Sequence, residues 1–423
     1  MNYTPKEIIN FVEENDVKFI RLSFSDIYGN LKNIAIMPSE LIRAFNYGIP
    51  FEAGFFSKEC SDLLLFPDIS TLSVLPWRPK SGRVIRFFCN IKHTDGSDYK
   101  GDLRYELIKL INKISEKGYT AKIGTRCEFY LFNTDENGNP TKIPHDNASY
   151  LDIAPLDKCE NARREICLSL EEMGFDPQTS RHSYGPAQNE IDFKRSTPVN
   201  AADNMAYYKT VVKNVAAQNG LFASFMPKPL KCGQGSGLHI NISIKKDGEH
   251  IFSPQSNTLT ETGKNFIAGI LNRIEDITCF LNPTTNSYER LCEKSSGTDS
   301  VSHLIRIPYT YEKHPCIEIC SADAACNPYM AFKLILAAGL EGIENTEVLE
   351  ENIFNNNIIY TGNRLPNSLQ NAVNSAKKSE FIKSYISEEI YNKLLKHYDD
   401  VIERYNLSDN KKKFEDDYYF ETI

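Results

Sequence analysis

Apolar and polar residues alternate along the first hundred residues in a pattern that predicts a small α+β domain. Thr4-Pro5-Lys6-Glu7 is a capping box with proline at the first helical position, which predicts a helix to about Glu14. The alternating segments VKFIRLSFSD and LKNIAIMP, separated by the turn IYGN, predict a β-hairpin. Ser39 is expected to cap the next helix, and RVIRFFCNIK predicts another strand. We assign these elements to a domain over residues 1–100.

The pattern then changes to long amphipathic helices that alternate with strands. Helical periodicity is present in RYELIKLINKISEKG, NARREICLSLEEMGF and NMAYYKTVVKNVAAQNG, and strand patterns are present in KIGTRCEFYLF and NEIDF. A late helical stripe, expected to form core or subunit contacts, consists of Ile390, Leu394, Leu395, Tyr398, Val401, Ile402 and Tyr405. This alternation predicts a second, larger α+β domain over residues 101–423.

Length and charge narrow the class of protein. A chain of 423 residues is long enough for two domains and a large core. The net charge of −8 is spread without basic tracts, which argues against nucleic acid as a partner. No apolar run is long enough for a membrane helix and the N-terminus lacks a signal-peptide pattern, so we expect a cytoplasmic protein without membrane contact.

Cysteine spacing does not indicate a zinc ribbon or a disulfide framework. The eleven cysteines include no CxxC pair, and most are expected to be reduced and buried. Cys316 and Cys320 flank the strand-like segment CIEIC, where packing is the favoured interpretation and metal ligation the alternative.

Ionisable residues gather on four strand-like segments. They are Glu128, His182, Glu190, His239 and Glu318. Three carboxylates and a histidine could together hold Mg²⁺ or Mn²⁺, because these hard ions prefer oxygen ligands and tolerate an imidazole. The alternative is that they are separate partners in surface salt bridges. Spacing alone does not decide between the two.

The glycine-rich segment GQGSG, residues 233–237, also has two interpretations. Its backbone N–H groups could bind phosphate or carboxylate oxygens, or it could be an ordinary turn. It lacks the patterns of a P-loop and of a dinucleotide-binding fold.

The order of several longer motifs resembles that of bacterial type I glutamine synthetases over nearly the whole chain. The motifs are PDISTLSVLPW (67–77), GDLRYEL (101–107), AQNEIDF (187–193), FMPKPL (225–230), GSGLHINIS (235–243), NPTTNSYERL (282–291), IRIP (305–308) and NPYMAF (327–332). The resemblance implies an α+β fold, with an N-terminal β-grasp domain and a glutamine synthetase catalytic domain built on a curved antiparallel sheet.

The same resemblance implies an activity and an assembly. The family joins glutamate to ammonia with ATP and two or three Mg²⁺ or Mn²⁺ ions, which act as Lewis acids on the transferred phosphoryl group. Each site is completed by the N-terminal domain of a neighbouring subunit, so a ring-shaped homo-oligomer is expected, most simply a dodecamer. Glutamate and ATP are the implied small-molecule ligands.

Several family site positions are retained. The resemblance implies metal ligands at Glu128, Glu190, His239 and Glu318, a glutamate-binding role for Arg290, a phosphate-side role for Arg306, an ammonium-side position at Glu52, and substrate or nucleotide contacts at Gln234, Gly235 and Ser243.

Other positions depart from the family. Arg126 stands where the family has a glutamate metal ligand, and Ser183 replaces another such ligand. Val301 and Cys320 replace two anion-binding arginines, and CEKSSGTDSVSH lacks the flap motif that carries a glutamate. The remaining ligands predict at most one divalent ion.

Arg126 therefore has two interpretations. Its guanidinium could replace a metal ion and pair with Glu318, or it could bind a new anionic substrate. For the whole protein, the favoured hypothesis is a non-catalytic or binding paralogue that cannot make glutamine at a normal rate. The alternative is an active ATP-dependent γ-glutamyl or other carboxylate–amine ligase that uses an altered substrate and one metal.

Overall fold

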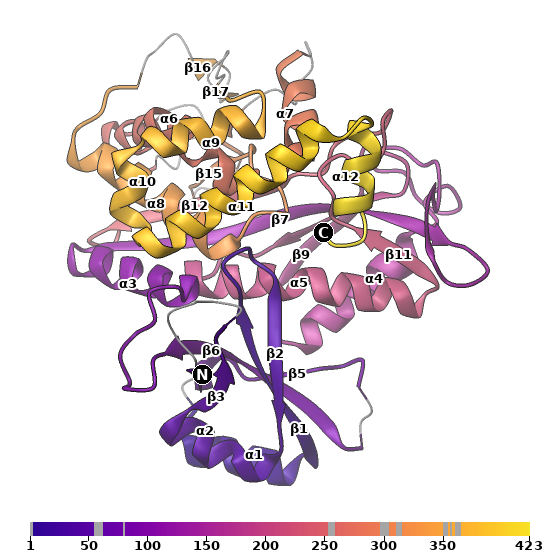
Figure 1. Cartoon of the computed structure of the whole chain (residues 1–423), viewed down its shortest axis with the longest axis vertical. Helices are drawn as coiled ribbons and strands as arrows, with labels where there is room; N and C mark the ends of the chain where they lie inside the picture. Colours follow the sequence, from indigo (N-terminus) through magenta and orange to yellow (C-terminus); the bar gives the residue numbers. More distant parts are fainter. Residues whose placement is uncertain are drawn as a thin grey trace.

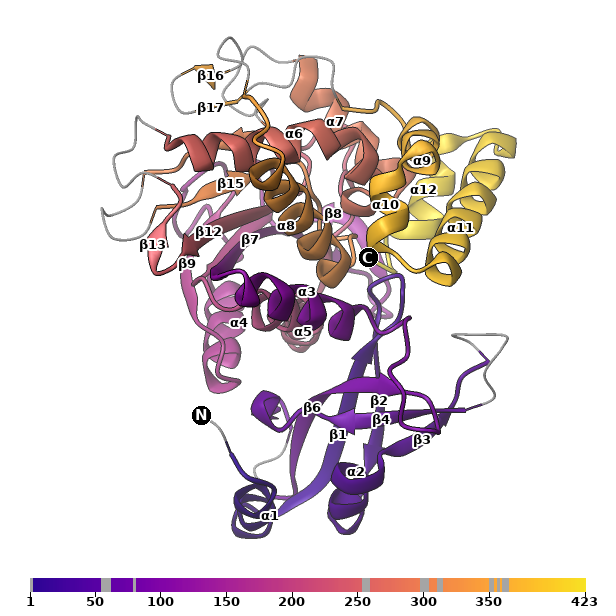
Figure 2. The same cartoon turned by 90° about the vertical axis from the view of Figure 1, so that its left-hand side faces the viewer.

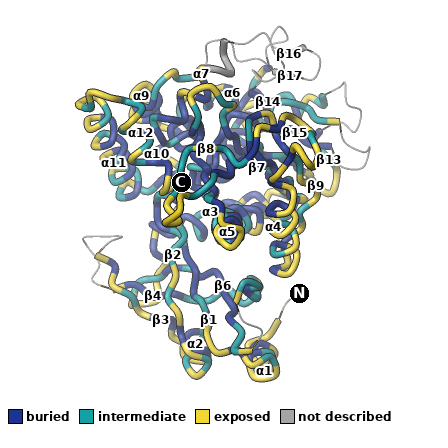
Figure 3. The backbone as a smooth tube through the Cα atoms, turned by 90° about the vertical axis from the view of Figure 1, so that its right-hand side faces the viewer, coloured by how far each residue is buried: buried dark blue, intermediate teal, exposed yellow. Residues whose placement is uncertain are grey.

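The chain folds as two lobes that lie at opposite ends of the molecule (Figures 1 and 2). Each lobe has its own buried interior (Figure 3). The computed structural model describes residues 3–54, 62–78, 81–252, 259–296, 304–309, 315–349, 354–355, 358–359 and 365–423. Among these residues, no helix combines the length and the apolar character that crossing a membrane requires.

The N-terminal lobe is a six-stranded sheet with its own hydrophobic core. Its strands follow the order β2-β1-β6-β4-β3, with β5 paired to β6, and β1 runs parallel to β6. Its elements are α1 (Pro5–Glu14), β1 (Val17–Ser25), β2 (Leu31–Ile36), η1 (Pro38–Glu40), α2 (Leu41–Tyr47), β3 (Ile49–Glu52), β4 (Asp62–Pro67), η2 (Ile69–Thr71), β5 (Ser73–Val74) and β6 (Arg83–Lys92).

Local sequence signals explain most of this lobe. The capping box at Thr4 is confirmed, because its hydroxyl accepts from the Glu7 N–H and the Glu7 carboxylate accepts from the Thr4 N–H. The β1–β2 hairpin is confirmed as well. The prediction for Ser39 was wrong: Pro38, with its fixed φ, begins a 3₁₀ turn that contains Ser39, and α2 begins at Leu41 without a side-chain cap.

The larger lobe is built on an eleven-stranded sheet in the order β16-β17-β14-β15-β12-β7-β10-β9, to which β8, β11 and β13 add further pairings. Its strands are β7 (Tyr119–Thr134), β8 (Pro140–Pro144), β9 (Pro177–His182), β10 (Gln188–Phe193), β11 (Leu221–Ser224), β12 (Leu238–Lys246), β13 (Glu249–His250), β14 (Ile305–Arg306), β15 (Ile317–Ile319), β16 (Phe354–Asn355) and β17 (Ile358–Ile359). Its helices are α3 (Leu103–Glu116), α4 (Glu160–Glu172), α5 (Pro198–Gln218), α6 (Glu261–Leu281), α7 (Thr285–Ser296), α8 (Pro328–Glu344), α9 (Leu369–Lys378), α10 (Glu380–Tyr385), α11 (Glu388–Leu407) and α12 (Lys411–Tyr419).

Strand β7 divides the polar site from the core. Helices α3, α4 and α5 lie on the side of the sheet that faces the N-terminal lobe (Figures 1 and 2). Phe129 of β7 packs against Tyr208 of α5, at a centroid distance of 6.2 Å, within the main core. Because side chains alternate along a strand, the even-numbered residues face the other side. There Arg126 and Glu128 form the polar end of the face, and Tyr130 begins its aromatic end.

The late helical stripe and the cysteines behave largely as predicted. The first six stripe residues are buried, whereas Tyr405 is partly exposed and packs against Phe414, with ring centroids 5.7 Å apart. Of the ten cysteines that the structure describes, seven are buried and all are free thiols.

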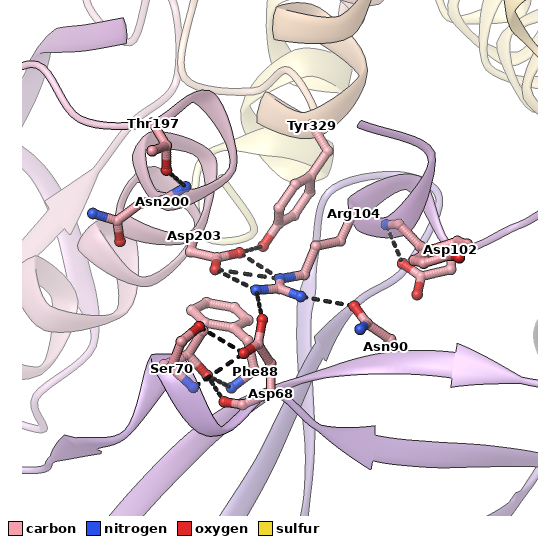
Figure 4. Close-up of polar contacts among 12 residues, drawn as sticks. Asp68, Ser70, Phe88, Asn90, Asp102, Arg104, Thr197, Asn200, Asp203 and Tyr329 are labelled. Carbon is pink, nitrogen blue, oxygen red and sulfur yellow. Dashed lines mark hydrogen bonds and ion pairs between the residues drawn. The ribbon is translucent and has the colours of Figure 1, made fainter. Parts of the chain in front are cut away.

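A buried charge network joins the two lobes (Figure 4). The guanidinium of Arg104 on α3 donates to both carboxylate oxygens of Asp203 on α5 at 2.9 Å, and to Asp68 of the N-terminal lobe at 2.8 Å. It also donates to Asn90 of β6 at 2.7 Å, and the Tyr329 hydroxyl donates to Asp203 at 2.7 Å. The PDIST segment therefore contacts the larger lobe of its own chain.

Candidate active site

Strand pairing places the predicted site residues in rows on one face of the sheet. Glu190 of β10 lies opposite Glu128 of β7, and His239 of β12 lies opposite Arg126 of β7. Glu318 of β15 lies beside Arg306 of β14. All are on the face directed away from α5, so residues separated by up to about half of the sequence become neighbours.

Arg126 lies at the centre of this cluster. Its Nη2 is 3.0 Å from Glu318 Oε1 and 2.8 Å from His239 Nδ1, and its Nε is 3.7 Å from Glu190 Oε1. His239 Nδ1 also lies 3.3 Å from Glu318 Oε1, so the three side chains form one cluster. The predicted pairing of Arg126 with Glu318 is confirmed.

Glu318 is held as a carboxylate from three sides. It is 1% exposed, and Arg306 pairs with its Oε2 at 2.5 Å while Arg126 pairs with Oε1. Burial by itself would raise the pKa of Glu318, but His239, Arg126 and Arg306 outweigh it and hold the pKa well below its usual range. The carboxylate is therefore ionised at neutral pH.

Glu190 is less strongly stabilised in its charged form. It forms an ion pair with Arg181 of β9, and Arg126 lies farther away. Burial, with Glu128 adding to it, raises the pKa of Glu190 to about 7 although both arginines lower it. This carboxyl therefore titrates near neutral pH.

Glu128 has both carboxylate oxygens engaged by the protein. The Ser183 hydroxyl donates to Oε1 at 2.7 Å, and the Gly237 N–H donates to Oε2 at 2.8 Å. The Ser183 hydroxyl thus orients the Glu128 carboxylate.

Arg290 lies under the glycine-rich loop. It is fully buried on α7, and Nη2 donates to Asn282 Oδ1 at 2.8 Å and to the Ser321 carbonyl. Its Nε and Nη1 have no hydrogen-bond partner among the described residues. A Cβ on Gly235 would lie 2.4 Å from Arg290 Cγ, so glycine is required there for close approach.

The glycine-rich loop is tied to the sheet through main-chain atoms. The Tyr130 hydroxyl donates to the Gln234 carbonyl at 2.6 Å, and Gln188 donates to the Gly235 carbonyl at 3.2 Å. The Gly237 N–H donates to the Glu128 carboxylate. The loop is therefore held to the sheet through its carbonyls, and the N–H groups of Gly233, Ser236 and Gly237 donate to acceptors within the protein.

Other sequence-predicted residues lie outside this cluster. His182 is buried and contacts Asp146 at 3.0 Å. Ser243 lies farther along β12, 3.4 Å from His250 Nδ1, and Glu52 lies exposed in β3 of the N-terminal lobe. Val301 and most of the flap segment lie outside the described residues.

The geometry also offers Cys320 as a metal ligand. Donor atoms of His239, Glu318 and Cys320 lie within 4.8 Å of one another. However, the Arg126 guanidinium contacts two of these three residues, so packing beside the cluster remains the favoured interpretation for Cys320.

Sequence reasoning missed the contribution of Arg181 and Asp192. Arg181 lies opposite Glu190, and its Nη2 also pairs with Asp192 at 3.3 Å. Alternation within the short strand Pro177–His182 could have shown that Arg181 and His182 face opposite sides. The pairing partner of that strand could not be read from it.

Residues 16–94 match the family model described as glutamine synthetase, beta-Grasp domain, and residues 100–416 match glutamine synthetase, catalytic domain. The chain belongs to the glutamine synthetase family. Its fold is accordingly a β-grasp domain followed by a glutamine synthetase catalytic domain with a curved sheet.

Glutamine synthetases of known sequence match almost the whole chain. The enzyme of Clostridium saccharobutylicum is 40% identical over 414 residues, covering 92% of this chain and 93% of that protein. The enzyme of Staphylococcus aureus strain Mu50 is 38% identical over 441 aligned positions, covering 99% of this chain and 95% of that protein. Membership of this family implies the use of ATP and a divalent metal.

Solved structures share the fold. A structure of GmaS in complex with ADP has a TM-score of 0.82 at 23% identity, covering 97% of this chain and 98% of its own. The glutamine synthetase of Plasmodium falciparum, solved by cryo-electron microscopy, has a TM-score of 0.83 at 21% identity, and 99% of each chain is covered.

Proposed function

We propose that this protein is a non-catalytic or binding member of the glutamine synthetase family that cannot make glutamine at an ordinary rate. The observation that carries the proposal is the position of Arg126, whose guanidinium contacts Glu318, His239 and Glu190. An internal cation thus occupies the place between acids where the family implies a metal ion.

Charge balance supports this proposal. Arg126, Arg181 and Arg306 pair with Glu190 and Glu318, and Glu128 is satisfied by Ser183 and Gly237. A metal ion bound by His239 and Glu318 would have to displace the Arg126 guanidinium from both residues. The donor set therefore fits an arginine there better than a metal ion. Losing one preorganised group typically costs about 10²–10³ in rate, and several positions differ here.

Metal stoichiometry provides the direct test. In a Mn²⁺ titration by calorimetry, we expect at most one weakly bound ion per subunit, held by Glu128 and Glu190 with water, because Mg²⁺-like ions retain water when protein ligands are few. Glu190→Gln should weaken that binding, whereas the exposed control Glu136→Gln should not. Two ions per subunit, or glutamine and phosphate formed at an ordinary enzymatic rate, would contradict the proposal.

An active ligase with an altered substrate is the second candidate. It is favoured by Arg290, a buried guanidinium with two nitrogens that have no protein partner among the described residues, which suits a ligand carboxylate. ATP-dependent phosphate release with a panel of acids and amines distinguishes the two candidates. Release that requires one particular acid–amine pair and is lost in Arg290→Met would favour the ligase.

We also propose a ring-shaped homo-oligomer, with a dodecamer as the simplest form, in which residues 1–100 and 101–423 act as the two domains. Family membership and the positions of the two family-model matches support this. Light scattering at micromolar protein should give a mass many times the 48.1 kDa of one chain. A monomeric mass would refute the assembly.

A further inference from the structure

The C-terminal segment, residues 411–423, packs on the aromatic end of the β7 face. Tyr419 and Phe420 are buried with Tyr130 and Phe132, and the Phe132 and Phe420 ring centroids are 5.2 Å apart. The Ser224 hydroxyl donates to the Phe420 carbonyl at 3.0 Å, and the Phe225 N–H donates to the Ile423 carbonyl at 3.1 Å. The segment therefore fills part of the core.

The same segment contacts two elements that carry the candidate site. On α7, Asn286 donates to Glu415 Oε2 at 2.9 Å, and the Thr285 N–H donates to the Tyr419 hydroxyl at 3.3 Å. Both α7 residues lie within five positions of Arg290 in the sequence. On the 225–237 segment, Lys412 Nζ donates to the Lys228 carbonyl at 2.9 Å.

Asn286 and Lys228 connect the C-terminal segment to the glycine-rich loop. Asn286 Oδ1 accepts from the Lys228 N–H at 2.6 Å, and the Lys228 ammonium donates to the Gly233 carbonyl at the start of the glycine-rich loop. Contacts of the C-terminal segment therefore reach the first turn of α7, the helix that carries Arg290, and reach the glycine-rich loop through Lys228.

We propose that residues 411–423 form a reversible latch: docking fixes α7 and the glycine-rich loop, and release frees both. The latch does not depend on whether the site binds metal or catalyses a reaction. Its acid-sensitive element is Glu415, which is fully buried and has no lysine or arginine nitrogen within ion-pair distance among the described residues.

The charge environment of Glu415 sets the direction of this sensitivity. The side chains that face Glu415 are Asn286, Thr285 and Glu289 of α7, Lys412 and Tyr419 of α12, and Tyr405 of α11. Lys142 of β8 pairs with the neighbouring Asp416. Burial, assisted by Glu289, raises the pKa of Glu415 to about 7. The docked latch thus favours the protonated acid, so docking weakens as pH rises from about 5 to 7 and is constant above that range.

Hydrogen exchange at matched pH tests this prediction. Dividing the opening equilibrium constant of the wild type by that of Glu415→Gln at the same pH removes the intrinsic exchange rate of the amides from the comparison. For peptides from α7 and from residues 411–423, we expect this ratio to rise by about tenfold between pH 5.5 and 6.5 and to level off above 7. The exposed control Glu421→Gln should differ little from wild type at each pH.

A second variant separates the latch from the titration. Phe420→Ala loosens the apolar anchor without changing charge, and it should increase exchange in α7 as well as in α12 at every pH, with little change in α4. Exchange that increases in α12 while α7 is unchanged would overturn the latch. A wild type to Glu415→Gln ratio that does not vary with pH would overturn the role of Glu415.

Discussion

Replacement of Arg104 by methionine is expected to lower the free energy of unfolding by about 3–5 kcal/mol, because it removes the buried cation from two carboxylates. Arg104 is 4% exposed and binds Asp203 in a bidentate arrangement while it reaches Asp68 across the lobe interface. Methionine keeps much of the side-chain volume, so the loss of charge and of hydrogen bonds, rather than a large cavity, should dominate.

Fluorescence-monitored urea denaturation can measure this effect. The chain has one tryptophan, Trp77, whose ring lies 6.3 Å from that of Tyr207 on α5, so its emission reports on the contact between the lobes. The matched control is Arg43→Met, since the Arg43 pair with Glu40 is exposed and such pairs contribute little. A midpoint for Arg104→Met as high as that of the control would show that the network does not stabilise the lobe interface.

Arg126→Glu should also be strongly destabilising in metal-free buffer, by about 3–5 kcal/mol, because it leaves Glu318 facing a new carboxylate instead of a guanidinium. Arg306 remains as a partner of Glu318, but Glu190 loses one of its two cations. Added Mn²⁺ should restore part of the stability, since an ion that binds only the folded state at 100 times its Kd contributes about 2.7 kcal/mol.

The matched control is Lys122→Glu, which makes the same charge change at an exposed position of the same strand. Thermal unfolding of both variants with and without Mn²⁺ gives the measurement, and only Arg126→Glu should respond to the ion. The proposed non-catalytic function predicts that glutamine synthesis should not return in that variant, because Ser183 and Cys320 are unchanged. An Arg126→Glu protein as stable as wild type without metal would show that Arg126 does not replace a cation.

These two arginines have different roles: one holds the lobes together and the other balances charge within the candidate site. Arg104 positions the N-terminal lobe and has no contact with the acids of the cluster, whereas Arg126 neutralises those acids directly. A comparison of the two variants therefore separates the stability of the domain arrangement from the charge balance of the site.

The sequence by itself determined the local elements and the family. The Thr4 capping box and the β1–β2 hairpin depend on residues within a few positions of each other, so short-range patterns predict them. Ordered motifs identified Glu128, Glu190, His239 and Glu318 as site candidates. Ser39 shows the limit even of local reasoning, because the proline before it starts a 3₁₀ turn one residue earlier.

Only the tertiary structure decided which of these residues meet. The contact of Arg126 with Glu318 requires β7, β12 and β15 to pair in one register, and a shift of one residue would turn each side chain to the other face. The role of Arg181 and the docking of Glu415 likewise depend on segments far apart in the chain. Sequence patterns report the period of each element, but burial and charge pairing between distant elements arise only when the sheet and helices pack together.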